Sequence, residues 1–328
     1  MGSTDSLSQK ANGFATEGGS VAAKVDENAT FRQNIVNVPP PVAIAATEDW
    51  DLVIRPTSGW LQLNLKDLCR YRDLLRMFVW RDFVAVYKQT ILGPVWFFIQ
   101  PLLTTATFTI IFSGVAKLPT DGLPPLLFYF AGTTPWNYFS TVVTKTSATF
   151  TTNSNLFGKI YFPRLVSPLS VVISTLVQFG IQFLLLFGLM GWYLLKGDTS
   201  IRPDWGGIVI MTPALIALLA GLGLGVGIIV SSLTTKYRDL SFLVNFGVQL
   251  AMYATPVVYP LSMVSEKHRH WLELNPMTPI IEAFRSVYLG VGSFSWGGLG
   301  YSTAFVMVVL FCGVLIFNRV EKSFMDTV

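Results

Sequence analysis

The sequence predicts an all-α polytopic membrane protein with six transmembrane helices, an N-terminal amphipathic interface helix and short re-entrant helices before the last span. Three observations support this class. Hydrophobic residues make up 52% of the chain. Charged residues make up 13%, which is about half the fraction typical of soluble domains. Long apolar stretches alternate with short polar connections, and basic residues gather in every second connection.

Each predicted span is a mostly apolar stretch of roughly 20 residues, the length that crosses a hydrocarbon core. The second is the most polar, because Pro135, Asn137 and Lys145 interrupt it. Prolines also interrupt residues 253–289, which favours half-membrane helices covered by protein or water. Glu282 and Arg285 are assigned to this external connection. The spans are expected at 95–116, 126–150, 169–195, 207–233, 240–263 and 300–318.

The positions of the basic residues predict the orientation. From residue 51 onward, thirteen lysines and arginines fall before the first span or after the second, fourth and sixth, against six in the opposite connections. Positive-inside asymmetry therefore places both termini in the cytoplasm. Residues 1–50 are polar, rich in small residues and without apolar periodicity, so this segment is expected to be disordered. The predicted regions are a cytoplasmic tail (1–50), the interface helix region (51–94), the membrane domain (95–318) and a C-terminal cytoplasmic tail (319–328).

The segment 66–92 has apolar residues near helical spacing, while Arg70, Arg76 and Arg81 lie mostly elsewhere on the helical wheel. Such a helix before a span lies along the cytoplasmic interface, and Gly93-Pro94 then ends it. A simple anchor for the first span is the alternative interpretation.

Several short patterns are better explained by packing than by chemistry. Gly221–Gly227 alternates glycine with apolar residues inside a span, with no strand before it, which favours close helix packing within the chain or across a dimer. Cys69 and Cys312 are far apart in sequence, and His268 and His270 stand without further metal ligands. No metal site and no catalytic residue are predicted.

A family resemblance extends over about residues 50–320. The run YRDLLRMFVWRDFVAVYKQTILGPVW (71–96) resembles the entry segment of the ABC-2 type permeases that export O-antigen, capsular polysaccharide or teichoic acid. Further similar stretches follow in order at Lys159–Arg164 (KIYFPR), Tyr237–Leu240 (YRDL) and Asn275–Pro279 (NPMTP). The first fifty residues lie outside the resemblance.

The resemblance implies the transmembrane subunit of an ATP-driven exporter of a lipid-linked polysaccharide in the bacterial cytoplasmic (inner) membrane. It also implies a homodimer with two copies of a separate cytoplasmic ABC ATPase subunit, which would bind the ATP and Mg. No cofactor is expected in this chain, and no nucleic acid partner. The residues agree, because Gly158-Lys159 is followed by Ile160 and lacks the upstream glycine of a phosphate-binding loop.

By resemblance, two groups of residues are candidates for function. Basic and mixed-charge residues suit a reversible ATPase interface, and aromatic rings suit the apolar faces of sugars. The candidates for docking are Arg70, Arg72, Arg76, Arg81, Lys159, Arg164, Lys236, Arg238 and Asp239. The candidates for the substrate conduit are Phe108, Phe112, Tyr129 and Tyr138.

Other functions remain open from the residues alone. A membrane enzyme needs clustered carboxylates, histidines or a metal, whereas the predicted spans contain almost no acidic residue. An ion-coupled carrier or channel usually has a charged residue near the midplane, but Lys145 lies near the cytoplasmic end of its span. An ABC-2 exporter of another lipid or a drug is a further alternative.

Overall fold

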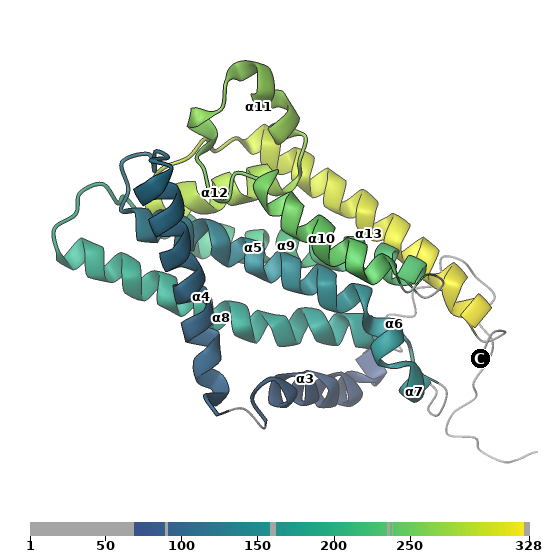
Figure 1. Ribbon diagram of the computed structural model, residues 1–328. Helices are drawn as coiled ribbons and strands as arrows, with labels where there is room; N and C mark the ends of the chain where they lie inside the picture. The colour runs from purple at the N-terminus through teal and green to yellow at the C-terminus, as the bar shows by residue number, and fades with distance from the viewer. Residues whose placement is uncertain (1–68, 89–90, 158–161, 235–236, 238, 325–328) are drawn as a thin grey trace, which may run out of the picture. The chain divides into compact units, whose positions relative to one another are not determined.

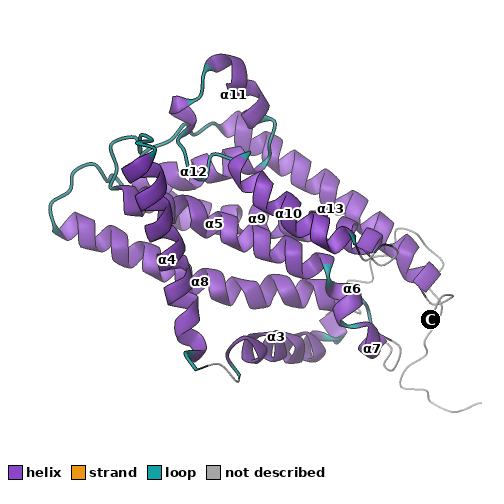
Figure 2. Cartoon of the chain, viewed as in Figure 1, coloured by secondary structure: helices purple, strands orange, loops and turns teal. Residues whose placement is uncertain are grey.

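The protein is described here from a computed structural model, which covers residues 69–88, 91–157, 162–234, 237 and 239–324. Within these ranges the regular structure is helical and no strand is present (Figure 2). The predicted N-terminal tail lies outside the described residues. The fold class is therefore confirmed at the level of an all-helical chain.

Among the described residues, four helical segments are long and apolar enough to cross a membrane. They are Trp96–Val115, made of α4 (Trp96–Phe108) and the π-helical η2 (Thr109–Val115), then α8 (Val166–Leu195), α9 (Trp205–Thr234) and Trp296–Arg319 within α13 (Trp296–Phe324). These correspond to the predicted first, third, fourth and sixth spans. The structure thus supports an integral membrane protein with four clear candidate spans.

The other two predicted spans differ from expectation. The second is the helix α5 (Pro125–Ser147), whose 23 residues are long enough but whose composition is too polar to meet the same criterion. Most of α5 is buried against α4, α8 and α9, so the protein solvates its polar side chains. The fifth is α10 (Leu240–Tyr253), which ends ten residues earlier than predicted. Pro256 and Pro260 account for this, since neither can continue a helical hydrogen-bond pattern.

Glycines let α9 pack closely on two neighbours. A Cβ added at Gly221 or Gly225 would lie 2.8 or 2.9 Å from valine side chains of α13, Val306 and Val309. Added at Gly223 or Gly227, it would lie 2.9 or 2.6 Å from Val142 or Thr146 of α5. The predicted packing role is confirmed, and these contacts are within one chain. Each pair of glycines four residues apart faces one neighbouring helix.

Short helices lie at both ends of the bundle (Figure 1). At one end are η3 (Leu261–Met263), α11 (Glu266–Glu273) and α12 (Met277–Leu289), so short helices do precede the last span as predicted. Backbone bonds from Arg202 and Asp204 to the carbonyls of Leu289 and Val287 join the α8–α9 connection to α12. At the other end are α3 (Arg72–Tyr87), η1 (Gly93–Val95), α6 (Thr149–Thr152) and α7 (Ser154–Phe157).

Exposed tryptophans gather at both ends. Trp192 at the end of α8, Trp205 and Trp296 at the starts of α9 and α13, and Trp271 of α11 are each more than half exposed. At the opposite end, Trp80 of α3 and Trp96 of α4 are also exposed. Tryptophan is enriched at membrane–water interfaces, so the group at the ends of α8, α9 and α13 fits a chain whose long helices cross a bilayer.

Candidate functional site

The apolar face of α3 packs on the segment that leads into α8. Phe78 is 8% exposed and meets Phe162 edge-to-face, with ring centroids 5.5 Å apart. Val166 completes this cluster, and Tyr71, Leu74 and Leu75 pack against it. The predicted amphipathic helix is therefore present, but its apolar face lies on protein. Its position at the membrane interface stays a prediction.

This packing brings the two main predicted docking elements together. Of the resembling stretch 159–164, residues 162–164 are described, and Phe162 packs directly on Phe78 of α3. Lys159, Lys236 and Arg238 lie outside the described residues. Asp239 is exposed at the N-terminus of α10.

The outward face of α3 is basic and carries exposed apolar side chains. Arg70, Arg72 and Arg76 are exposed, and Arg76 pairs with Asp73 at 3.5 Å in a solvent-exposed ion pair. Met77 and Trp80 are each 66% exposed. Arginine and tryptophan are the residues that most often dominate binding energy at protein interfaces. This face, defined by Arg70, Arg72, Arg76, Met77 and Trp80, is called the α3 outer face below.

Arg164 has a different environment from the other docking candidates. Its side chain is buried, with 6% of the residue exposed, and its guanidinium lies 5.7 Å from the centre of the Phe157 ring. Arg164 therefore packs inside the chain, against Phe157 of α7, and is not part of the exposed surface. Its role in docking stays a prediction.

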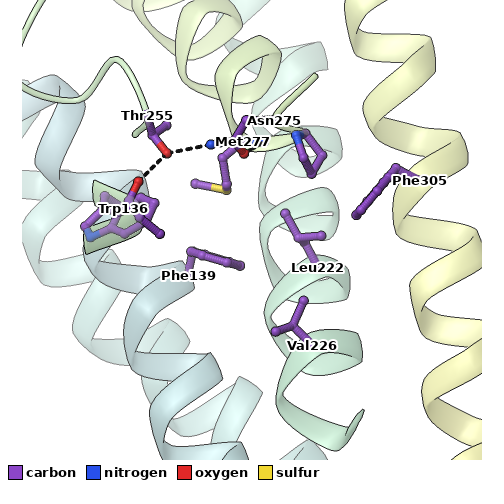
Figure 3. Close-up of a pocket in the computed structure, with 10 residues that line it drawn as sticks. Trp136, Phe139, Leu222, Val226, Thr255, Asn275, Met277 and Phe305 are labelled. Carbon is purple, nitrogen blue, oxygen red and sulfur yellow. Dashed lines mark hydrogen bonds between the residues drawn. The ribbon is translucent and has the colours of Figure 1, made fainter. Parts of the chain in front are cut away.

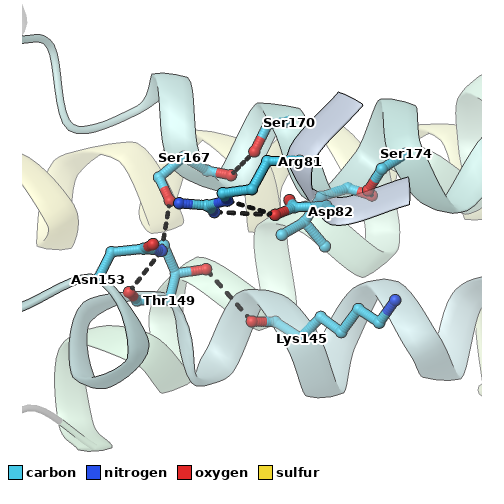
Figure 4. A network of polar contacts seen from close by, with 9 residues as sticks. Arg81, Asp82, Lys145, Thr149, Asn153, Ser167, Ser170 and Ser174 are labelled. Atoms are coloured by element: carbon cyan, nitrogen blue, oxygen red, sulfur yellow. Dashed lines mark hydrogen bonds and ion pairs between the residues drawn. The ribbon is translucent and has the colours of Figure 1, made fainter. Parts of the chain in front are cut away.

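A polar seam runs beneath the inner edge of α3 (Figure 4). The Arg81 guanidinium donates two hydrogen bonds to the Asp82 carboxylate, at 2.8 and 3.0 Å. Below this pair, Asn153 Nδ2 donates to Ser167 Oγ at 2.9 Å. Thr149 Oγ1 of α6 donates to the Lys145 carbonyl of α5 at 3.2 Å. The seam thus places charges of α3 beside polar groups of α5, α6 and α8.

The four predicted conduit aromatics split into two pairs. Phe108 and Phe112 are half-buried on α4 and η2 and meet edge-to-face at 5.5 Å. Tyr129 and Tyr138 of α5 are almost fully buried within the chain, at 0% and 2% exposed. Tyr129 packs against Phe112, and the Tyr138 hydroxyl donates to the Val172 carbonyl at 3.4 Å. In this conformation the tyrosines contact their own chain, and their place in a conduit stays a prediction.

Sequence reasoning missed an outward stripe on α10. No residue of α10 is fully buried, and its exposed face alternates aromatic rings with amides at helical spacing. Asn245 and Gln249 are exposed, and Phe242, Phe246 and Tyr253 are 79%, 58% and 48% exposed. On α4, Gln100 and Thr107 likewise point outward. The spacing of residues 242, 245, 246, 249 and 253, called the α10 stripe below, could have been found from the sequence.

Glu282 and Arg285 fall in the connection before the last span, but the expectation that this connection is a loop at their positions is wrong. Both lie in α12, at 3% and 1% exposed, and the Arg285 Nη1 atom is 3.5 Å from Glu282 Oε1. Arg285 donates to the carbonyls of Pro256 and Val257 at 2.7 and 2.5 Å, and its guanidinium lies 4.0 Å from the centre of the Phe128 ring. Non-helical backbone inside a membrane protein must be satisfied by protein groups, and Arg285 supplies them to the turn after α10.

The order of these elements matches a known family. The model of the ABC-2 type transporter family matches residues 73–289, from α3 to the end of α12 and more than half of the chain. The chain belongs to the ABC-2 type transporter family. The matched range begins inside α3, so this helix belongs to the part of the ABC-2 chain that the family model covers.

Named relatives of this ABC-2 chain are permeases. The O-antigen export system permease protein RfbA of Klebsiella pneumoniae is 29% identical over 259 residues, covering 77% of this chain and 94% of that protein. RfbA of Myxococcus xanthus is 29% identical, covering 68% of this chain and 83% of the relative. The polysialic acid transport protein KpsM of Escherichia coli is 22% identical, covering 72% and 89%.

Proposed function

We propose that this chain is the transmembrane permease subunit of an ATP-driven ABC exporter that moves a lipid-linked polysaccharide across the bacterial cytoplasmic membrane. Relatives named for O-antigen export and polysialic acid transport support this substrate class. In the proposed topology α5 and α10 are the second and fifth of six spans. Both termini are cytoplasmic, and α11 and α12 form a re-entrant pair on the outer side.

The α10 stripe is the observation that carries the proposal. In hydrocarbon, the exposed amides of Asn245 and Gln249 would lack hydrogen-bond partners, which is costly. A conduit for a hydroxyl-rich polymer removes that cost, because amides both donate and accept hydrogen bonds. The neighbouring rings of Phe242 and Phe246 offer apolar faces to sugar C–H groups. Neither α4 nor α10 contains a charged residue, which suits a sugar polymer better than an ion relay.

A homodimer would enclose this conduit. The window of α4–η2 is only 11% buried, and α10 has no buried residue, so both present broad faces beyond the single chain. In the proposed dimer these faces from the two copies surround the polysaccharide. Phe108 and Phe112 would flank it from the α4 side.

The ATPase is proposed to dock on the α3 outer face. Its arginines supply charge-assisted hydrogen bonds, and Met77 and Trp80 supply apolar anchors. Because the opposite face of α3 is clamped on the segment before α8, a push on α3 would reach a span directly. Two ATPase copies, one per permease chain, would bind ATP and Mg.

The test is export by a strain in which Asn245→Leu and Gln249→Leu replace both amides. We expect roughly tenfold less polysaccharide at the cell surface, since each lost hydrogen bond is worth about 1 kcal/mol. Asn245→Gln with Gln249→Asn keeps both amides and is the matched control, expected to export normally. Wild-type export by the leucine variant would contradict the conduit. Purification of the cross-linked native complex without a phosphate-loop protein would contradict the exporter itself.

A further inference from the structure

A small cavity lies between α5, α9, α10 and α13 (Figure 3). Its volume is about 120 Å³. The helices α10 and α13 both pack on α9 but make little contact with each other, which leaves the cavity between them. Its floor consists of buried side chains, whereas Ala251 of α10 and Phe305 of α13 are partly exposed at its mouth. The floor residues are Trp136, Phe139, Leu222 and Met277. The cavity is therefore an opening between helices and not a sealed void.

The polar groups at one end of the cavity are already satisfied. Asn275 Nδ2 donates to Thr255 Oγ1 at 2.8 Å, and Thr255 Oγ1 donates to the Ala251 carbonyl at 2.7 Å. Asn275 Oδ1 accepts from the Met277 N–H at 3.0 Å. Since these groups bond to one another, a guest gains little from being polar. The remaining lining is aromatic and aliphatic, which selects an apolar guest.

The surroundings indicate where that guest comes from. The helices that border the mouth carry exposed apolar side chains, including Leu250 on α10 and Val308 on α13. In the last candidate span, Trp296–Arg319, only 22% of the most apolar window is buried in the chain, so much of its surface would be open to hydrocarbon in a bilayer. Hydrocarbon chains would therefore be the molecules that can reach the mouth.

We propose that this cavity is a binding site for one segment of a lipid hydrocarbon chain. An apolar cavity of roughly 150 Å³ holds benzene, so this one holds about five carbon atoms, the size of one isoprene unit. A chain that leaves the bilayer gains no hydrophobic transfer energy, so the gain is dispersion contact with the aromatic floor.

The proposal goes beyond the exporter assignment and does not depend on it. The same chemistry could come from an acyl chain of a bilayer phospholipid or from the polyprenyl carrier of a lipid-linked substrate. Both are hydrocarbon, and the volume of the cavity matches one isoprene unit of the polyprenyl chain. Two probes distinguish the sources.

The experiment is photolabelling of the full-length chain in nanodiscs with a photoreactive palmitoyl phosphatidylglycerol and, separately, a photoreactive polyprenyl phosphate. We expect labelled peptides to include Val226 or Phe305. Ala251→Leu fills the mouth and should lower the labelling of these peptides roughly fivefold or more. Ala304→Leu makes the same substitution at an exposed position of α13 outside the lining and should leave it unchanged. Preference for the polyprenyl probe would identify the substrate carrier, and preference for phosphatidylglycerol a bilayer lipid.

A second variant covers the case in which Ala251→Leu does not fold. Phe305→Ala widens the mouth and should maintain or raise labelling at Val226. Labels spread evenly over the exposed helix faces, or equal labelling of Ala251→Leu and wild type, would overturn the proposal. Because export is not the readout, that failure would leave the proposed function standing.

Discussion

At the scale of single residues, the buried pair of Glu282 and Arg285 ties three parts of the chain together. Arg285 binds carbonyls of the turn after α10, and Glu282 accepts from the Ser293 backbone N–H at 2.8 Å before α13. One ion pair on α12 therefore satisfies backbone groups on both sides of it. A buried charge without its partner is strongly destabilising, so the two residues depend on each other.

Arg285→Met should destabilise the protein by about 3–5 kcal/mol, because it leaves the buried Glu282 carboxylate without its opposite charge and two buried carbonyls without the donor that Arg285 provides. Thermal unfolding in mild detergent measures this. Arg269→Met removes an exposed pair with Glu273 and should cost less than about 1 kcal/mol. Similar unfolding midpoints for the two variants would show that the buried pair has no such role.

At the scale of elements, α9 is a helix whose stability depends on its neighbours. Glycine lowers helix propensity by about 1 kcal/mol per residue relative to alanine. In α9 the glycines at 221–227 offset that cost by letting α5 and α13 approach. The same residue has no such use in α10, where Gly247 has no atom within 4 Å of an added Cβ.

Opposite effects are expected for the two sites. Gly225→Val should destabilise by about 1–3 kcal/mol, since its Cβ would lie 3.1 Å from the backbone nitrogen of Leu310. Gly247→Ala should be neutral or stabilising by up to about 1 kcal/mol. Urea or thermal denaturation of both purified variants checks the sign. Equal losses would refute the distinction between a packed and an open glycine.

The helix α3 connects the proposed ATPase interface to the membrane domain. Reversing charge with Arg70→Glu and Arg76→Glu should abolish most export while leaving membrane insertion intact, because these exposed residues lie on the α3 outer face and not in the Phe78 cluster. Co-purification of the ATPase and surface polysaccharide are the readouts. Phe78→Ala is the comparison: it should lower stability as well, by about 3–5 kcal/mol. Normal export by the arginine variant would exclude this face as the dock.

At the scale of the whole molecule, two packed chains are expected in solution. The helices α4 and α10 expose faces without charged residues, and the side-chain amides on these faces point away from the core of the single chain. Light scattering of the purified permease, corrected for detergent, should give the mass of two copies. A monomer that still exports after reconstitution would contradict the homodimer.

Much of the fold could be predicted from the sequence because hydrocarbon imposes length and apolarity on its spans. The helices α4, α8, α9 and α13 follow that rule. The helix α3 was predictable for another reason, because its apolar residues recur at helical spacing. The helix α5 was harder to predict as a span, because it contains Thr, Asn and Lys residues. Other helices surround most of α5, which makes these polar residues tolerable. The buried position of Arg285 could not be predicted from the sequence. A charged residue is normally assigned to an exposed loop, and only the structure shows the backbone carbonyls that it binds.

The candidate site was predictable in part for a similar reason. Basic residues on α3 are visible as a pattern, but nothing in the order of residues shows that Phe78 meets Phe162 or that Arg164 is buried. The tyrosines at 129 and 138 have the right chemistry for sugars, yet their burial depends on packing between α5 and its neighbours. The α10 stripe was accessible from spacing alone.

The glycines of α9 also have a consequence for biogenesis. A ribosome releases α9 before α13, so for a time the glycine face that receives Val306 and Val309 is open to lipid. Until α13 arrives, α9 has the low helix propensity of glycine without the contacts that offset it. Chains truncated after α12 should therefore be degraded by membrane proteases faster than the full-length chain. Protection from these proteases would then begin when α13 is synthesised and packs on α9.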